Sequence, residues 1–199
     1  MRLAVLASGQ GTNLMALAAA IASGEVPAEI AIVGGDREAP ALAWARERGI
    51  ATFFAPAREI GMAQWERRLL ATMTDAGVDA VVLAGFMRVL SGAFVALFPE
   101  RILNVHPSLL PAFPGLDAIG QALAHGVRVT GVTVHFVDQG LDEGPIILQE
   151  ALPVRTGEGR DELEARVHAV EHRLLPEAVR LLSLGRLQVR GRIVDIMEG

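Results

Sequence analysis

Three features are missing from this 199-residue sequence: cysteine, a long apolar run and an excess of positive charge. Without cysteine, disulfides, thiolate catalysis and cysteine-based zinc sites are excluded. No apolar run approaches the roughly 20 residues of a membrane-spanning helix, and the stretch 2–7 is too short for a signal peptide. A net charge of −5 argues against a nucleic-acid-binding surface. We therefore expect a protein of the cytoplasm that binds small molecules, neither nucleic acid nor membrane.

The first hundred residues alternate between apolar runs and helical patterns. Half of the residues are hydrophobic (51%), and the length suits one domain with a full core. Runs that are apolar on both faces are typical of parallel strands covered by helices. The order predicts an α/β fold, a mostly parallel, Rossmann-like twisted sheet with helices on both faces. We predict strands at 2–7, 28–35, 51–55, 78–85 and 101–105, and helices at 12–24, 39–49, 63–77 and 91–99.

After residue 127 the pattern changes. The runs 129–137 and 145–154 are joined by a short loop and predict an antiparallel strand pair on an otherwise parallel sheet. A long helix is predicted for 159–185 from apolar residues at helical spacing, and Pro176 is predicted to kink or break it. The remaining tail predicts a small hairpin. Because no repeat, linker or low-complexity segment is present, we interpret residues 1–199 as one domain.

The first candidate motif is "ASGQGTNL" at 7–14, where a predicted strand leads into a predicted helix. Gly9 and Gly11 permit tight turns, and the helix N-terminus adds free N–H groups and partial positive charge, which together favour phosphate. No Lys-Ser/Thr pair follows, so this is no Walker A loop. Leu14 replaces the third glycine of a dinucleotide fingerprint. The alternative is an ordinary strand-to-helix turn with glycines for geometry.

The second candidate motif is "RILNVHPSLLPAFPG" at 101–115. In a strand, Asn104 and His106 point to the same side, at a carboxyl end where α/β sheets bind ligands. An amide stabilises an oxyanion, and an imidazole transfers protons near neutral pH. Three prolines then stiffen the chain: Pro107, Pro111 and Pro114. The alternative is a capped strand end with a structural histidine.

A third candidate is the acidic loop "DQGLDEGP" at 138–145. It carries Asp138, Asp142 and Glu143, and a carboxylate near a histidine keeps that histidine charged and oriented. The alternative is a solvated acidic turn. His135 lies inside the preceding strand, where we interpret it as a structural residue; the alternative is a supporting role in the site.

Metal binding is weakly supported by the sequence. His168 and His172 have helical i, i+4 spacing, but no third ligand is evident. His106 and His135 have no ligand-type spacing. We therefore predict no metal site.

Four motifs in this order resemble the phosphoribosylglycinamide formyltransferases of purine biosynthesis. The string Asn-x-His-Pro-Ser-Leu-Leu-Pro with a later Leu-Asp-x-Gly-Pro is specific for the wider formyltransferase superfamily. The Gly-x-Gly-Thr-Asn loop narrows the resemblance to the phosphoribosylglycinamide formyltransferases within it. The resemblance covers nearly the whole chain and implies 10-formyltetrahydrofolate as formyl donor. The motifs are "SGQGTNL" at 8–14, "AGFMRVLS" at 84–91, "NVHPSLLPAFPG" at 104–115 and "GVTVHFVDQGLDEGPIILQ" at 131–149.

By that resemblance, each motif acquires an expected role. Residues 1–100 are expected to be a phosphate-binding half and 101–199 a catalytic and folate-binding half. One position departs from the family: Met62 stands near a place that is often basic, and Arg58 is the nearest substitute. The implied catalytic residues are Asn104, His106 and Asp142; the implied substrate-binding residues are Gly11, Thr12, Asn13 and Glu171; the implied folate-pocket wall is Met87, Arg88, Val89, Leu90 and Leu141, with the loop from Val137.

The resemblance also implies a mechanism. The substrate amine attacks the formyl carbon, Asn104 and protonated His106 stabilise the oxyanion, and His106 passes a proton towards the leaving folate nitrogen while Asp142 keeps it charged. Methionyl-tRNA formyltransferases share the Asn-x-His-Pro core, but they carry a further C-terminal domain and bind RNA. Formyltetrahydrofolate hydrolases usually carry an extra N-terminal domain. A non-catalytic folate- or nucleotide-binding protein is the third alternative, and the oligomeric state is left open between monomer and homodimer.

Overall fold

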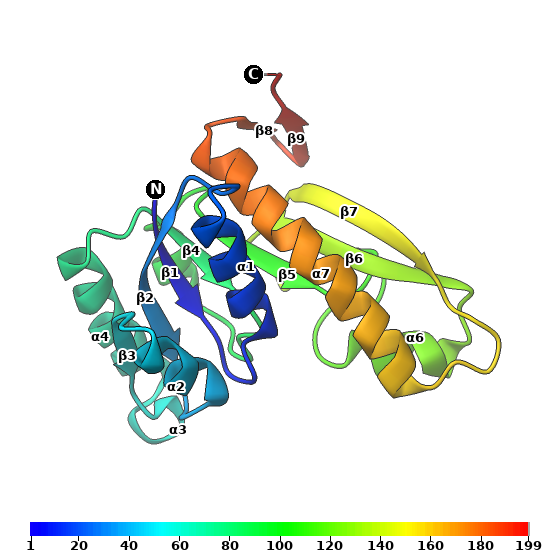
Figure 1. Ribbon diagram of the computed structural model, residues 1–199, viewed down its shortest axis with the longest axis horizontal. Coiled ribbons are helices and arrows are strands. Elements are labelled where there is room, and N and C mark those ends of the chain that lie inside the picture. Colours follow the sequence, from blue (N-terminus) through cyan, green and yellow to red (C-terminus); the bar gives the residue numbers. More distant parts are fainter. Residues whose placement is uncertain (199) are drawn as a thin grey trace.

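One nine-stranded sheet runs through residues 1–198, which the computed structural model describes (Figure 1). Its strand order is β3-β2-β1-β4-β5-β6-β7-β9-β8. The strands are β1 (Arg2–Leu6), β2 (Glu29–Gly35), β3 (Thr52–Phe54), β4 (Ala80–Leu83), β5 (Ile102–His106), β6 (Val129–Phe136), β7 (Ile146–Pro153), β8 (Leu187–Arg190) and β9 (Ile193–Ile196). The helices are α1 (Thr12–Ala22), α2 (Pro40–Glu47), α3 (Ala57–Ile60), α4 (Met62–Asp75), α5 (Gly92–Val95), α6 (Ala118–His125) and α7 (Arg160–Ser183).

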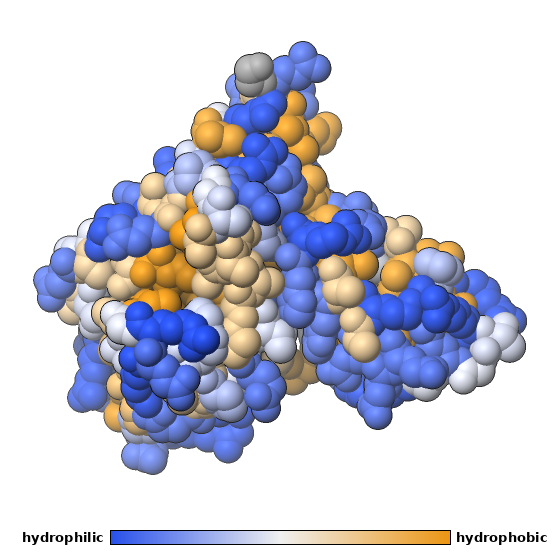
Figure 2. All heavy atoms as spheres, viewed as in Figure 1, coloured by the Kyte–Doolittle hydropathy of each residue, from blue (hydrophilic) through white to orange (hydrophobic). Residues whose placement is uncertain are grey.

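The strand directions confirm the predicted α/β fold. Strands β3, β2, β1, β4 and β5 pair in parallel. Strand β6 is antiparallel to both β5 and β7, as the change of pattern after residue 127 predicts. The C-terminal hairpin β8–β9 is also confirmed. It projects from the body of the molecule, and hydrophobic atoms are visible on its surface (Figures 1 and 2). Ile193 and Ile196 of β9 are exposed.

Helices cover both faces of the sheet. Leu14 and Leu17 of α1 and Leu163 of α7 share one core with the strands. Trp65 and Leu69 of α4 belong to a second core on the other face. Because alternate residues of a strand point to opposite faces, β1 and β4 contribute to both cores, which explains their continuous apolar sequences.

Helix α7 continues through Pro176, so of the predicted kink or break the break does not occur. The helix runs unbroken from Arg160 to Ser183 and buries one long apolar face. Pro176 itself is buried in that face, with Leu175 and Val179 beside it. A proline in a helix removes one hydrogen bond, but packing of an amphipathic face stabilises helices in proteins more than any single backbone bond does. Burial along α7 therefore outweighs the local preference of Pro176.

Two short helices are not predicted by the sequence patterns. Helix α6 contains Gly120 and spans only two turns, yet the Asp117 side chain accepts a hydrogen bond from the Gly120 N–H and Gly126 closes the helix in the left-handed conformation. Helix α3 is a single turn that Gly61 separates from α4. Both are too short for a periodic apolar pattern to stand out. Among residues 1–198, no helix is long and apolar enough to cross a membrane.

The topology gathers several loops at one edge of the sheet. The strands β2, β1, β4 and β5 are neighbours and parallel, so their carboxyl ends meet there. The loops that follow them begin at residues 36, 7, 84 and 107. In open α/β sheets, ligands bind at this edge, and three of the sequence motifs lie wholly or partly in these loops.

Candidate active site

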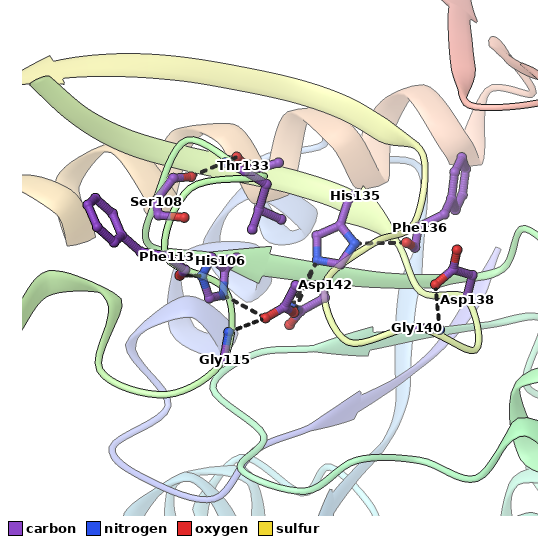
Figure 3. A network of polar contacts seen from close by, with 12 residues as sticks. His106, Ser108, Phe113, Gly115, Thr133, His135, Phe136, Asp138, Gly140 and Asp142 are labelled. Atoms are coloured by element: carbon purple, nitrogen blue, oxygen red, sulfur yellow. Dashed lines mark hydrogen bonds and ion pairs between the residues drawn. The ribbon is translucent and has the colours of Figure 1, made fainter. Parts of the chain in front are cut away.

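Asn104, His106 and His135 share one face of the sheet (Figure 3 labels the two histidines). Asn104 lies opposite His135 in the antiparallel register of β5 and β6, and His106 lies opposite Thr133. The alternate residues Leu103 and Val105 face the core on the opposite side. This alternation confirms that Asn104 and His106 point to the same side. It also adds His135, which the sequence alone does not connect with them.

Asp142 is the point on which this group converges (Figure 3). Its Oδ2 accepts a hydrogen bond from the Gly115 N–H at 2.7 Å and lies 3.5 Å from Nδ1 of His106. Its Oδ1 lies 3.4 Å from Nδ2 of Asn104. The loop 137–145 leaves β6 and folds back so that Asp142 reaches β5. Asp142 has a φ of 55°, a conformation that non-glycine residues adopt at a cost and that is frequent at functional sites.

The His106 ring is held between two acceptors. Its Nε2 lies 2.8 Å from the Phe113 carbonyl oxygen, to which it donates, and its Nδ1 faces the Asp142 carboxylate. A neutral imidazole has only one N–H, so only the protonated ring offers a donor to both neighbours. His106 is buried, with an exposed fraction of 5%. The ring is therefore fixed in one orientation, with Nε2 against the Phe113 carbonyl and Nδ1 turned towards Asp142.

His135 is neutral and orients Asn104. Its Nδ1 donates to the Phe136 carbonyl oxygen at 2.8 Å, so its Nε2 accepts from Nδ2 of Asn104 at 3.1 Å. Burial is the largest influence on the pKa of His135 and lowers it below the usual 6.5. Because the ring is uncharged, its 3.7 Å approach to Asp142 is a contact and not an ion pair. The interpretation of His135 as purely structural is thus too narrow, because it directs the amide nitrogen of Asn104 into the site.

The segment after His106 is fixed by buried hydrogen bonds as well as by its prolines. Thr133 donates from Oγ1 to the Ser108 carbonyl oxygen at 2.7 Å and accepts from the Leu110 N–H at 3.1 Å. The Gln149 amide donates to both Thr133 and the Leu110 carbonyl oxygen. These bonds tie the loop to β6 and β7, so the Phe113 carbonyl that orients His106 is itself held in place.

The glycine loop after β1 leads into α1 as predicted. Gly11 is the residue before the helix and has a φ of 78°, in the left-handed region that favours glycine. No side chain caps the first turn. The first N–H groups of a helix have no partner within it, so those of Thr12 and Asn13 remain available to an anion.

The Asn13 side chain bonds to α7. Its Nδ2 donates to Oε2 of Glu171 at 2.8 Å, across 158 positions of sequence. Glu171 also lies 3.9 Å from Nε2 of His168. Burial, the largest influence, raises the pKa of Glu171 and outweighs the lowering by Asn13 and His168. The structure thus brings together Asn13 and Glu171, which the resemblance implies as substrate-binding residues.

The implied folate-pocket residues divide into exposed and buried groups. The apolar side chains of Met87, Val89 and Leu141 are exposed by 55%, 71% and 55%, which leaves them free to contact a ligand. Leu90 is buried in the second core. The Arg88 side chain forms an ion pair with Asp36. The segment Met87–Leu90 therefore combines apolar side chains that a ligand can reach with two residues, Arg88 and Leu90, that hold the segment in place.

The loop 137–145 lies between the start of α5 and the segment that follows His106. A Cβ on Gly92 would lie 3.6 Å from Gln139, and a Cβ on Gly115 would lie 3.6 Å from Leu141. The loop therefore spans from the start of α5 to the segment after His106, with Val137 half-buried against the second core. Asp138 accepts a bond from the N–H of Gly140 within the loop and does not join Asp142.

A family comparison covers most of the chain. Residues 1–179 match the family model described as "Formyl transferase". The chain belongs to the formyl transferase family. It is 43% identical over 206 residues to "Phosphoribosylglycinamide formyltransferase" of Mycobacterium tuberculosis, with 98% of this chain and 94% of that protein covered. The Escherichia coli protein of the same name is 40% identical over 191 residues, covering 95% of this chain and 90% of the relative.

Solved structures of formyl transferases share the fold. Glycinamide ribonucleotide transformylase 1 from Symbiobacterium toebii superposes with a TM-score of 0.95 at 48% identity, covering 100% of this chain and 94% of that one. A formyltetrahydrofolate deformylase from Pseudomonas syringae has a TM-score of 0.93 at 24% identity, with 99% of this chain and 66% of that chain covered. This second likeness concerns the fold alone.

Met62, Arg58 and the two histidines of α7 are the remaining residues that the sequence singled out. Met62 begins α4 and packs against the second core, whereas Arg58 is exposed on α3. Within residues 1–198, no group of three or more His, Cys, Asp or Glu side chains is arranged to hold a metal ion. His168 and His172 stack with ring centroids 6.1 Å apart, and no third ligand joins them in that part of the chain.

Proposed function

We propose that this chain transfers the formyl group of 10-formyltetrahydrofolate to the amine of glycinamide ribonucleotide, a step of de novo purine biosynthesis. The observation that carries the proposal is the convergence of Asn104 and His106 on Asp142, at the sheet edge that also holds the uncapped N-terminus of α1. The names of the relatives at 40–43% identity support the same reaction.

Asn104 supplies one donor to the oxyanion that forms when the amine attacks the formyl carbon. One N–H of its amide is committed to His135 at 3.1 Å. The other faces Asp142 at 3.4 Å, a long and weak hydrogen bond. Because that bond is weak, the N–H can donate to the oxyanion without rotation of the amide. Because His135 holds the amide in one orientation, the donor is in place before the reaction, as electrostatic stabilisation requires.

His106 supplies the second donor and moves the proton. Nε2 stays bonded to the Phe113 carbonyl, so Nδ1 is the nitrogen available to the reacting atoms. At 3.5 Å, Nδ1 attracts the Asp142 carboxylate as a charge without a close hydrogen bond. Nδ1–H therefore stabilises the oxyanion and gives its proton to the folate nitrogen as the bond between that nitrogen and the formyl carbon breaks. The proton that the attacking amine loses then restores the ring, which Asp142 keeps oriented.

We assign each ligand to its own loops beside these residues. Gly11, Thr12 and Asn13 bind the phosphate of the ribonucleotide through backbone N–H groups, and Glu171 contacts the same substrate. The unpartnered Oδ1 of Asn13 is buried beside Glu171, which fits a polar ligand group at that point. The folate-pocket wall comprises Met87, Arg88, Val89, Leu90 and Leu141, with exposed apolar side chains that fit a folate ring.

The organisation of the protein follows from these assignments. We place the phosphate-binding half at 1–100 and the catalytic and folate-binding half at 101–199 of one domain, with the segment Met87–Leu90 reaching from the first half to the folate. The absence of cysteine fits a reducing compartment, so we place the activity in the cytoplasm. The partners are small molecules, with neither nucleic acid nor membrane, and the protein acts as a monomer or homodimer.

The assay that tests the proposal measures release of tetrahydrofolate from 10-formyltetrahydrofolate with and without glycinamide ribonucleotide. Release that requires the ribonucleotide supports the transferase. Equal release in both reactions would identify a hydrolase, in which water replaces the amine. No release in either reaction would contradict the proposal and leave a binding protein.

Replacement of Asn104 by alanine is expected to lower kcat by about 10²–10³-fold, the usual cost of one oxyanion donor. The KM for both ligands should change little, because the amide acts on the reacting atoms. Steady-state kinetics measures both parameters, and Gln188→Ala, at an exposed position of β8, serves as the control. Wild-type turnover in the Asn104 variant would remove this residue from the mechanism.

Replacement of Glu171 by glutamine is expected to stabilise the protein at neutral pH and to raise the KM for the ribonucleotide. The pKa of Glu171 is raised in the folded state, so its contribution to stability is full below about pH 4.5 and is lost as pH rises through the folded pKa. Glutamine stays neutral, so the melting temperature of the variant should exceed that of the wild type at pH 8, and the difference should shrink at pH 4. Thermal unfolding at both pH values measures this, with exposed Glu59→Gln as control; a lower melting temperature at pH 8 would contradict the role of burial.

A further inference from the structure

A buried polar network connects three loops at the ligand-binding edge of the sheet. Ser8 follows β1, Asp36 follows β2 and Arg88 follows β4. These strands are neighbours in the order β2-β1-β4. Ser8 begins the glycine loop that leads to Gly11, and Arg88 lies in the Met87–Leu90 segment. None of the roles described above uses Asp36.

The contacts pass through a single hydroxyl and a single carboxylate. The Ser8 hydroxyl donates to Oδ1 of Asp36 at 2.6 Å and accepts from the Met87 N–H at 3.0 Å. Arg88 donates from Nε to Oδ2 of Asp36 at 2.8 Å, and Arg37 lies 3.5 Å from Oδ1. Both oxygens of Asp36 are thus engaged, one by the loop after β1 and one by the loop after β4.

Asp36 remains charged despite its burial. Its side chain has an exposed fraction of 0%. Burial is the largest influence and raises the pKa of Asp36, but the hydrogen bonds from Ser8 and Arg88 with the nearby guanidinium charges lower it overall. Removing one partner of a buried ion pair costs far more than breaking an exposed pair. The position of Asp36 therefore constrains Ser8 and Arg88 strongly.

The ion pair is not arranged for stability alone. Nη2 of Arg88 is buried, and residues 1–198 provide it with no hydrogen-bond partner. A buried donor without a partner costs free energy, and a guanidinium bound through Nε alone forgoes the two-point contact that carboxylates favour. The arrangement fixes the position of Arg88 relative to Ser8 through Asp36, and it leaves Nη2 of Arg88 without a hydrogen-bond partner among residues 1–198.

We infer that Asp36 is a positioning residue that couples the two ligand sites, by fixing the loop for the ribonucleotide phosphate relative to the loop for the folate. The inference rests on the proposed function, which assigns Gly11–Asn13 to the phosphate and Met87–Leu90 to the folate. Ser8 is three residues from Gly11 and contacts Met87 directly. A ligand that orders one loop therefore orders the other through Ser8 and Asp36, so each ligand binds more tightly when the other is present.

Binding without turnover tests the inference. The dissociation constant of glycinamide ribonucleotide is measured calorimetrically with and without saturating tetrahydrofolate, the product that carries no formyl group. The wild type should bind the ribonucleotide at least roughly fivefold more tightly in the presence of tetrahydrofolate, within the usual range for coupled sites. In Asp36→Asn that factor should fall towards one. In kinetics, the KM for both substrates should rise roughly tenfold while kcat changes much less, because Asn104 and His106 lie on β5.

Two further variants distinguish a loss of coupling between the two ligand sites from a general loss of order in the binding loops. Glu66 is also buried and accepts from the Ser91 hydroxyl at 2.6 Å and the Ser91 N–H at 2.7 Å, so Glu66→Gln removes a similar carboxylate beside the folate segment alone. It should change folate affinity and leave the coupling factor intact. Ser8→Ala should reduce the coupling factor, and the double variant with Asp36→Asn should lose little more, because both changes break one network.

The outcomes divide clearly. A wild type that binds both ligands without mutual influence overturns the coupling and leaves the proposed function intact. Coupling that survives in Asp36→Asn, or that Glu66→Gln abolishes equally, also overturns it. A wild type that binds neither ligand contradicts the proposed function, and the inference falls with it.

Discussion

Replacement of Asp142 by asparagine is expected to lower kcat by about 10³–10⁴-fold, comparable to the loss when the carboxylate of another histidine–aspartate pair is made an amide. Asp142 faces the Gly115 N–H, Nδ1 of His106 and Nδ2 of Asn104. An asparagine keeps one acceptor oxygen but turns an NH₂ donor towards one of these donors. It also removes the negative charge that faces Nδ1 of His106 at 3.5 Å. Steady-state turnover with both substrates measures the effect.

A second aspartate on the same loop is the control for this variant. Within residues 1–198, the Asp138 side chain bonds only inside the loop, where it accepts from the N–H of Gly140 at 2.9 Å. Asp138→Asn should therefore retain kcat within about threefold, because substitutions outside buried hydrogen-bond networks usually have small effects. Comparable losses in both variants would mean that Asp142 acts through loop conformation, and its assigned role would be wrong. Unchanged turnover in Asp142→Asn would exclude it from the mechanism altogether.

Replacement of His106 by alanine is expected to lower kcat by about 10³-fold or more, because one side chain supplies both an oxyanion donor and the proton. The KM for the ribonucleotide should change little, since the loop at Gly11 lies after a different strand. Single-turnover kinetics isolates the chemical step. A circular dichroism spectrum and a melting curve establish that the variant is folded.

A histidine outside the assigned residues provides the comparison for His106→Ala. His172 lies on α7 and faces the groove between α1 and α7 with Ala16 and Arg173. His172→Ala should retain wild-type kcat. Restoration of part of the activity of His106→Ala by added imidazole would show that the missing function is chemical. A folded His106→Ala enzyme with wild-type turnover would contradict the proposed mechanism.

Much of the fold follows from local pattern. The apolar runs predict β1, β2, β4, β5, β6 and β7 to within about two residues, and the switch after residue 127 predicts the antiparallel pair. Local pattern succeeds here because burial on both faces forces a continuous apolar strand. Pro176 shows where it fails. A rule about one residue does not include the apolar face that α7 buries on both sides of that proline.

The candidate site divides in the same way. The spacing of Asn104 and His106 sets them on one face, because side chains alternate along any strand. The contact of Asn104 with His135 depends on the register between β5 and β6. That register is a long-range property, and a single-residue shift would turn His135 to the other face. The bond between Asn13 and Glu171, across 158 positions, is likewise decided by how α1 packs on α7.

The sequence by itself determined the fold class, the glycine loop, the Asn104–His106 pair and the family resemblance, because each depends on neighbouring residues and on periods of a few residues. Only the tertiary structure decided that Asp142 returns to β5, that His135 is neutral and orients Asn104, and that Asp36 joins Ser8 to Arg88. These features depend on burial and on strand order, which bring distant residues together and shift their charge states. Neither burial nor strand order can be deduced from the residues immediately around a position.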